Sequence, residues 1–232
     1  MKKQRISIER VPALLWGETA EKLYLSIHGQ GGNKEGAIVL ANRVCPMGYQ
    51  VLSIDMPGHG ERTSEADIFD PWHCVPEIAE VMQFARQGWK KISLHAVSIG
   101  AWFSMQALSR EKLENCAFVS PIVDMEGLIR KMMLWANVSE ELLEERKVIP
   151  TDFGQTLSWE YFTWVLKHPI ERWEAPTNIL YGEKDHLMDQ DQIEKFAQKY
   201  SATLTIMEDG EHWFHTPEQM AFMEQWMELY VN

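Results

Sequence analysis

The sequence predicts an α/β fold in which helices cover both faces of a mostly parallel sheet, with a helical cap inserted after its middle. Short β-rich runs alternate with segments of 3.6-residue periodicity along most of the chain. Strands separated by helices are typical of parallel sheets buried on both faces. The 232 residues are 45% hydrophobic, which is enough for one sizeable core. We therefore expect a single domain over residues 1–232.

The first half of the chain supplies most of the expected sheet. ISIERV and ALLWG indicate two opening strands that could form a hairpin. Pro121 is expected to end the last strand of this half, and Gly88 to close a helix. The other expected strands are KLYLSIHG, YQVLSI, KKISLHAV and NCAFVSP, and the expected helices cover residues 34–45, 76–89 and 98–109.

The alternation is interrupted at residues 122–172 and resumes afterwards. This block contains a helical stretch rich in Met, Trp and Leu at residues 127–148 and a stretch with five aromatic residues at 157–173, and we interpret it as a cap over the sheet. Strands are expected again at TNILYG and ATLTIM, each followed by a helix, at residues 189–200 and 217–230.

Composition excludes several classes of protein. The formal net charge of -12 argues against nucleic acid or an anionic membrane surface as a partner. Cys45, Cys74 and Cys116 are widely spaced, so neither a disulfide framework nor a zinc site is expected. The basic start resembles a signal peptide, but charged residues interrupt any long apolar run there. No stretch is apolar enough to span a membrane, and we expect a cytoplasmic protein.

Residues suited to catalysis follow the expected strands, at the sheet edge where the sites of such folds lie. His28-Gly29-Gln30-Gly31-Gly32 follows one strand and DMPGHGER follows the next. Ser98, Asp185 and His212 follow three further strands, in the segments HAVSIG, YGEKD and EDGEH.

Together these motifs resemble those of the α/β-hydrolase superfamily, in particular its serine esterase and lipase-like members with a small helical cap. The resemblance covers nearly the whole chain except residues 122–172, and the order Ser, Asp, His is that of the family. It implies an eight-stranded type of sheet. It also implies that Ser98 is the nucleophile on a sharp turn between strand and helix. Ala96 stands where the usual motif has glycine, which predicts a slightly wider turn with the serine still exposed.

The resemblance makes His212 the general base and Asp185 the residue that orients it. Among the other histidines, His28 and His59 belong to loops that would shape the floor of the site, and His95 lies within a strand. His215 could form an HxxH metal pair with His212, but no further ligand accompanies the pair. We therefore expect no metal site.

Asp124 and Glu183 are rivals for the acid. Asp124 also follows a strand, but YGEKD is closer to the family's acid turn, so Asp185 is favoured. Asp55 and Arg62, in DMPGHGER, are expected to be structural and to pair within their loop.

An oxyanion hole needs two N–H donors aimed at the developing negative charge. The backbone N–H groups of Gln30 and Ile99 are the expected donors. The glycines beside Gln30 could also cradle a phosphate, but neither nucleotide-binding motif is present.

The aromatic and methionine residues of the cap could have either of two roles. Most are expected to pack the cap against the core. Met133, Trp135, Trp159 and Trp164 are candidates to line an apolar substrate pocket over Ser98.

The resulting hypothesis is a serine carboxylesterase that cleaves small or medium esters through an acyl-enzyme and needs no cofactor. A thioesterase or a peptidase or amidase would use the same triad, and a catalytically silent ligand-binding protein could keep the fold. Whether the chain forms a homo-oligomer is left open by the sequence.

Overall fold

A computed structural model describes residues 1–231 of the chain. Within these residues, eight strands form one sheet in the order β1-β2-β4-β3-β5-β6-β9-β10. β2 runs antiparallel to β1 and β4, and the remaining neighbours are parallel, so the predicted sheet is confirmed. The strands are β1 Lys3–Ile8, β2 Val11–Trp16, β3 Lys22–Ile27, β4 Tyr49–Ile54, β5 Lys91–Val97, β6 Cys116–Val119, β9 Thr177–Gly182 and β10 Thr203–Met207.

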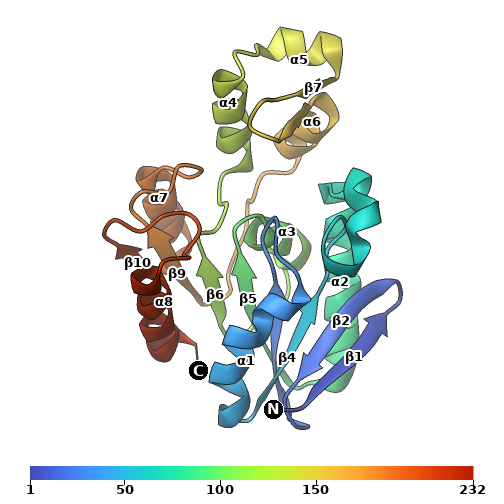
Figure 1. The fold of residues 1–232 in the computed structure, drawn as a ribbon, viewed down its shortest axis with the longest axis vertical. Coiled ribbons are helices and arrows are strands. Elements are labelled where there is room, and N and C mark those ends of the chain that lie inside the picture. The colour runs from blue at the N-terminus through green and yellow to red at the C-terminus, as the bar shows by residue number, and fades with distance from the viewer. Residues whose placement is uncertain (232) are drawn as a thin grey trace.

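Helices cover both faces of the sheet (Figure 1). α1 (Ile38–Val44) and α8 (Pro217–Tyr230) lie on one face, over a buried cluster that includes Tyr24 and Trp226. α2 (Pro71–Gly88), α3 (Ile99–Leu108) and α7 (Gln190–Tyr200) cover the other face. The strand face toward α2, α3 and α7 is largely apolar, as expected for parallel strands buried on both sides. The other face also buries polar side chains, namely Ser26, Ser53, Ser93 and His95.

Local sequence signals explain where several helices begin. The Asp70 side chain accepts a hydrogen bond from the His73 N–H, and Pro71 occupies the first position of α2. α8 begins with a capping box, in which Thr216 and Gln219 each accept a hydrogen bond from the backbone of the other. These caps satisfy backbone donors that the first turn of a helix leaves unpaired.

The structure differs from the expected elements mainly at helix ends. α2 begins at Pro71 rather than at residue 76, because the Asp70 cap and a tolerated Pro76 extend it by a turn. The expected helix over residues 34–45 divides into a 3₁₀ turn, Lys34–Ala37, and α1. The DMPGHGER loop continues into a 3₁₀ segment, Gly60–Ile68.

The cap is inserted between β6 and β9 and projects beyond the carboxyl ends of the strands (Figure 1). A short hairpin that the sequence did not predict, made of β7 and β8, connects its helices. The expected first helical stretch is divided by a turn at residues 136–139. The cap elements are α4 Met125–Trp135, α5 Glu140–Arg146, β7 Val148–Pro150, β8 Thr156–Ser158 and α6 Trp159–Lys167.

Among the helices of residues 1–231, none combines the length and the apolar character needed to cross a membrane.

Candidate active site

Ser98 stands at a sharp turn between β5 and α3. Its φ of 51° and ψ of -124° lie in a region that residues other than glycine rarely adopt. The turn is held by neighbouring backbone, since the Ser98 N–H donates to the Val119 carbonyl at 3.0 Å and the Ile122 N–H donates to the Ser98 carbonyl at 3.1 Å. Such a strained turn keeps a serine hydroxyl at the sheet edge rather than inside the following helix.

Gly100 explains why the turn needs small residues. A Cβ at this position would collide with the carbonyl oxygen of His28, in the loop after β3. That contact is with backbone, so a side chain cannot be accommodated by a change of rotamer. Ala96 is fully buried in β5, opposite Ile27 and Phe118, and the width of the turn stays a prediction.

The structure brings Ser98, His212 and Asp185 into one hydrogen-bonded chain. Ser98 Oγ lies 2.8 Å from His212 Nε2, and His212 Nδ1 lies 2.6 Å from Asp185 Oδ2. The Asp185 side chain is fully buried, and its other oxygen accepts hydrogen bonds from the N–H groups of Leu187 and Met188 at 2.8 and 3.2 Å. An imidazole that bonds a carboxylate at Nδ1 can accept a serine proton at Nε2.

Close packing of two loops brings the acid to the histidine. A Cβ at Gly182, the glycine of YGEKD, would lie 2.5 Å from the carbonyl oxygen of Gly210. The Lys184 N–H donates to the same carbonyl at 2.7 Å. The glycine therefore allows the loop after β10 to lie against the acid turn, which places His212 over Asp185.

Asp124, the rival acid, is occupied elsewhere. One of its oxygens accepts a hydrogen bond from the Gly127 N–H at 2.8 Å and caps α4, and the other accepts from Gln192 Nε2 at 2.8 Å. Glu183 accepts a hydrogen bond from the Asp209 N–H at 3.0 Å. The geometry thus joins Asp185 to His212 and gives these carboxylates other partners.

The loop after β3, which carries the expected oxyanion donor Gln30, approaches Ser98 at Gly29, where an added Cβ would lie 3.0 Å from the Ser98 Cβ. His28 fixes the start of this loop: its Nδ1 lies 2.7 Å from the Gly29 carbonyl, and its Nε2 accepts the Met56 N–H at 3.1 Å. Burial lowers the pKa of His28 to about 4, so the ring is neutral near pH 7 and the proton belongs on Nδ1. Ile99, the other expected donor, is the first residue of α3.

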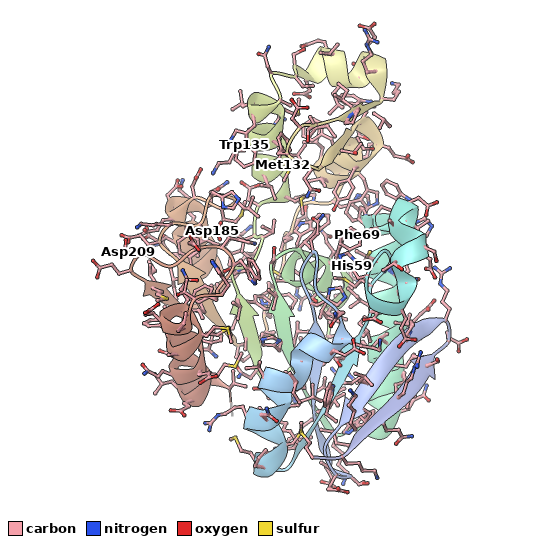
Figure 2. All side chains as sticks on the ribbon, viewed as in Figure 1. His59, Phe69, Met132, Trp135, Asp185 and Asp209 are labelled. Carbon is pink, nitrogen blue, oxygen red and sulfur yellow. The ribbon has the colours of Figure 1, made fainter. Side chains whose placement is uncertain are left out.

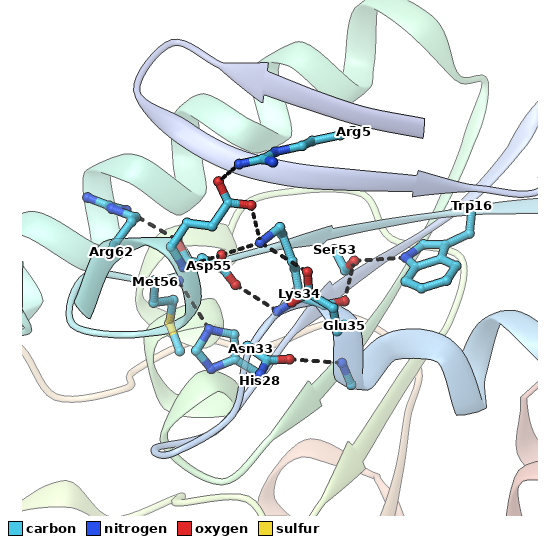
Figure 3. Close-up of polar contacts among 12 residues, drawn as sticks. Arg5, Trp16, His28, Asn33, Lys34, Glu35, Ser53, Asp55, Met56 and Arg62 are labelled. Atoms are coloured by element: carbon cyan, nitrogen blue, oxygen red, sulfur yellow. Dashed lines mark hydrogen bonds and ion pairs between the residues drawn. The ribbon is translucent and has the colours of Figure 1, made fainter. Parts of the chain in front are cut away.

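A buried ion pair that the sequence did not predict stabilises the end of the same loop (Figure 3). Lys34 is 1% exposed, and its ammonium donates to Asp55 at 2.5 Å and to Glu61 at 2.7 Å. The Lys34 N–H also donates to Asp55, at 2.8 Å. Burial alone would lower the pKa of Lys34, but these carboxylates outweigh it and raise the pKa to about 12. Burial likewise opposes ionisation of Asp55, yet its hydrogen bonds hold its pKa below the usual range.

The expected pairing of Asp55 with Arg62 is wrong at the level of side chains. Arg62 donates to the carboxylates of Glu77 and Glu65, at distances down to 2.6 Å, and reaches only the backbone carbonyl of Asp55. The reason is that Lys34 already occupies the Asp55 carboxylate. The signal in the sequence was the lysine in HGQGGNK, a charged residue placed where a buried loop begins.

His95 and His59 have partners outside the serine–histidine–aspartate chain. His95 is buried, and burial lowers its pKa to about 4. Its Nδ1 lies 3.3 Å from Ser26 Oγ. The ring of His59 packs against His28 and Phe69, with centroids 5.0 and 4.7 Å apart. Within residues 1–231, no three His, Cys, Asp or Glu side chains converge so as to hold a metal ion.

The proposed pocket residues fall into two groups. Trp135 is 45% exposed and lies at the end of α4; its ring faces His186, which in turn touches the His212 ring. The other three pack within the cap or against the sheet helices. Met133 is buried in the main core, Trp159 packs against Phe162, and Trp164 against Trp102 and His168.

Figure 2 shows how the surroundings of the site are divided. Met132 and Trp135 project from the cap helix α4, Asp185 lies below them on one side, and His59 and Phe69 lie on the other. His186, which the sequence analysis did not single out, follows Asp185 directly. Its position beside the carboxylate that contacts His212 was the available signal.

A strained serine turn, a serine–histidine–aspartate chain and an eight-stranded sheet together define the α/β-hydrolase class. The sequence profile of the alpha/beta hydrolase family matches residues 25–225. The chain belongs to this family, as the sequence motifs predict.

Solved structures agree on the fold. Est1E from Butyrivibrio proteoclasticus, with ferulic acid bound, is 17% identical with a TM-score of 0.77, over 98% of this chain and 99% of that one. A putative hydrolase from Agrobacterium vitis is 14% identical with a TM-score of 0.81, over 100% and 99%. The thioesterase domain from the curacin biosynthetic pathway is 16% identical with a TM-score of 0.61, over 98% and 99%. A comparison with curated proteins finds no match.

Proposed function

We propose that the protein is a serine hydrolase of the carboxylesterase kind that cleaves small or medium esters through an acyl-enzyme. The observation that carries the proposal is the chain from Ser98 Oγ to His212 Nε2 at 2.8 Å and from His212 Nδ1 to Asp185 at 2.6 Å. Distances of this size allow direct proton transfer without rearrangement. The strained backbone of Ser98 supports the same role.

In the proposed reaction, His212 Nε2 takes the Ser98 proton while Oγ attacks the ester carbonyl carbon. Asp185 holds the imidazole in the tautomer that leaves Nε2 free, and stabilises the imidazolium that forms. The backbone N–H groups of Gln30 and Ile99 are the proposed donors to the oxyanion. His212 then returns the proton to the leaving alcohol. Water, activated by the same histidine, hydrolyses the acyl-enzyme.

The proposed pocket for the substrate includes Met133, Trp135, Trp159 and Trp164. Trp164 packs edge-on against Trp102 of α3, with centroids 5.8 Å apart, so it joins the cap to the body of the enzyme. If it limits an acyl pocket, Trp164→Ala will shift the preferred acyl chain length. Met133 is 5% exposed, so its removal should lower stability as well.

A thioesterase is the second candidate, and the similarity to a thioesterase domain favours keeping it. The same triad can also cleave amides and peptides, and a silent ligand-binding protein remains the alternative outside enzymes. Cytoplasmic location also stays a prediction, as does association into a homo-oligomer.

Labelling with a fluorophosphonate separates enzyme from binder. We expect the native protein to be labelled at Ser98 and Ser98→Ala to be unlabelled. A panel of p-nitrophenyl esters of increasing chain length, with matching thioesters, then gives the substrate class. Absence of labelling in a folded native protein would overturn the hydrolase proposal.

A further inference from the structure

A row of side chains from other segments extends from the His212 ring, through the cap, to the loop after β3. The His186 ring meets the His212 ring edge-on, with centroids 6.3 Å apart, and lies nearly parallel to Trp135, at 6.5 Å and 29°. Trp135 in turn meets Phe153 edge-on at 5.7 Å. Two residues further along the cap hairpin, Gln155 accepts a hydrogen bond from Gln30 at 3.4 Å. The row therefore connects His212, the proposed general base, with the proposed oxyanion loop by way of the cap.

The row has the character of a binding surface rather than a core. Trp135 is 45% exposed and Phe153 is 39% exposed, although both are large apolar side chains. Exposed aromatic rings that gather beside a reactive group mark ligand sites more often than scattered ones do. Figure 2 places Trp135 on the same side of the molecule as Asp185, across from His59 and Phe69.

Trp135 is also held in place before any ligand arrives. The Lys131 ammonium lies 5.9 Å from the centre of its ring and forms an ion pair with Asp189 at 2.7 Å. Asp189 belongs to the loop that carries the acid. A ring that already contacts a cation and a neighbouring imidazole loses little freedom when a ligand stacks on it.

Reaction chemistry decides which half of an ester meets this row. The bond from Ser98 Oγ to the acyl carbon forms, and the bond from that carbon to the alcohol oxygen breaks. The proton from Ser98 passes through His212 Nε2 to the departing alkoxide. The alcohol oxygen must therefore lie at His212, and the rest of the alcohol extends along the residues beside that ring.

We infer that His186, Trp135 and Phe153 form a leaving-group subsite for planar aromatic alcohols. This inference rests on the proposed esterase function. Because Trp135 and Phe153 stay 45% and 39% exposed, the subsite accepts large groups and favours flat ones by stacking. The acyl half lies on the other side of the carbonyl and is not affected by this row.

The test compares two esters that share a butyryl group, ethyl butyrate and 2-naphthylmethyl butyrate. For the native enzyme we expect a higher kcat/KM with the naphthylmethyl ester. Trp135→Ala should lower the ratio of the two kcat/KM values by about 2- to 12-fold, the range for one aromatic contact. Trp135→Phe should keep most of the preference, and His186→Ala should also reduce it.

Leu134→Ala is the matched control, because Leu134 neighbours Trp135 on α4 but is 80% exposed and outside the row of contacts. For Leu134→Ala, the ratio of the two kcat/KM values should equal that of the native enzyme. Both esters are measured on one preparation, so a loss of folded protein cancels in the ratio. An unchanged ratio in an active Trp135→Ala enzyme would overturn the subsite. Failure of the native protein to cleave either ester, with no fluorophosphonate labelling, would instead overturn the proposed function.

Discussion

The base of the site, meaning the buried polar side chains under its loops such as Lys34, Asp55 and His95, differs from the cap above it in the kinds of side chain that are buried and exposed. In the base, charged and polar side chains are buried and hydrogen-bonded to one another: Lys34 is 1% exposed and Asp55 is 0% exposed. In the cap, large apolar side chains remain open to solvent, among them Trp135 at 45% and Val148 at 57%. Buried polar groups fix one geometry, because leaving any of them unpaired is costly. Exposed apolar groups impose no such constraint on their neighbours.

This contrast separates the two tasks of a hydrolase. We expect the base to hold the reacting atoms in place and the cap to select substrates by contact area. Substitutions in the base should therefore reduce turnover or stability, and substitutions at the exposed cap residues should change selectivity.

The largest expected effect concerns the acid. Asp185→Asn should lower kcat by about 10⁴-fold, because an amide at this position favours the wrong tautomer of His212. Asp124→Asn should leave kcat within about twofold of the native value, since asparagine caps a helix as well as aspartate does. Steady-state kinetics on a p-nitrophenyl ester measure both. A large loss in Asp124→Asn with native activity in Asp185→Asn would reverse the assignment.

The next effect concerns the buried ion pair behind the loop after β3. Lys34→Met removes the cation and leaves Asp55 buried without it, which should cost about 3–5 kcal/mol of unfolding free energy. Adding Asp55→Asn should recover part of this loss, because no uncompensated charge then remains. Urea unfolding measures both proteins.

Lys90→Met is the matched control for that prediction. Lys90 pairs with Glu21 at the same 2.5 Å, but the two side chains are 75% and 72% exposed. Exposed pairs contribute little, so no measurable change in unfolding free energy is expected. Equal losses at Lys34 and Lys90 would contradict the view that burial, rather than pairing, makes the base sensitive.

The same contrast explains what the sequence could predict. Strand alternation and the motifs after each strand were enough to predict a mostly parallel sheet and to single out Ser98, Asp185 and His212, because parallel strands bring their carboxyl ends to one edge. The order of the strands within the sheet was not predicted. The partner of Asp55 could not be predicted in this way. Lys34 and Arg62 are both close in sequence to glycine turns, and only the three-dimensional path of the loops decides which cation reaches the carboxylate.

The cap was harder to predict for a related reason. Aromatic residues at helical spacing fit a core face and a pocket wall equally well. Met133 and Trp135 are two positions apart on α4, yet one is 5% and the other 45% exposed. The unpredicted β7–β8 hairpin, which brings Phe153 to Trp135, could not be read from strands of three residues each.

The pH dependence of stability should also come from the base. His95 is buried, with its pKa lowered to about 4, whereas an unfolded histidine has a pKa near 6.5. Below about pH 6.5 the unfolded chain takes up a proton that the folded ring does not. The stabilisation is therefore complete above that pH and is lost as the pH falls toward 4.

His95→Gln tests this effect. Between pH 7 and pH 5 the native protein should lose up to about 2 kcal/mol more unfolding free energy than the variant. Denaturant unfolding at the two pH values gives the difference. Parallel losses in native protein and variant would show that His95 is not responsible.

The smallest expected effect lies where base and cap meet. The hydrogen bond from Gln30 Nε2 to Gln155 Oε1 is long, at 3.4 Å, and Gln30 is exposed. Gln155→Ala should therefore leave kcat unchanged and alter KM by less than about threefold, because the proposed oxyanion donor is the backbone N–H of Gln30 and not its side chain. A loss of kcat above tenfold in this variant would mean that the cap helps to hold the reacting atoms, and the division of tasks between base and cap would then fail.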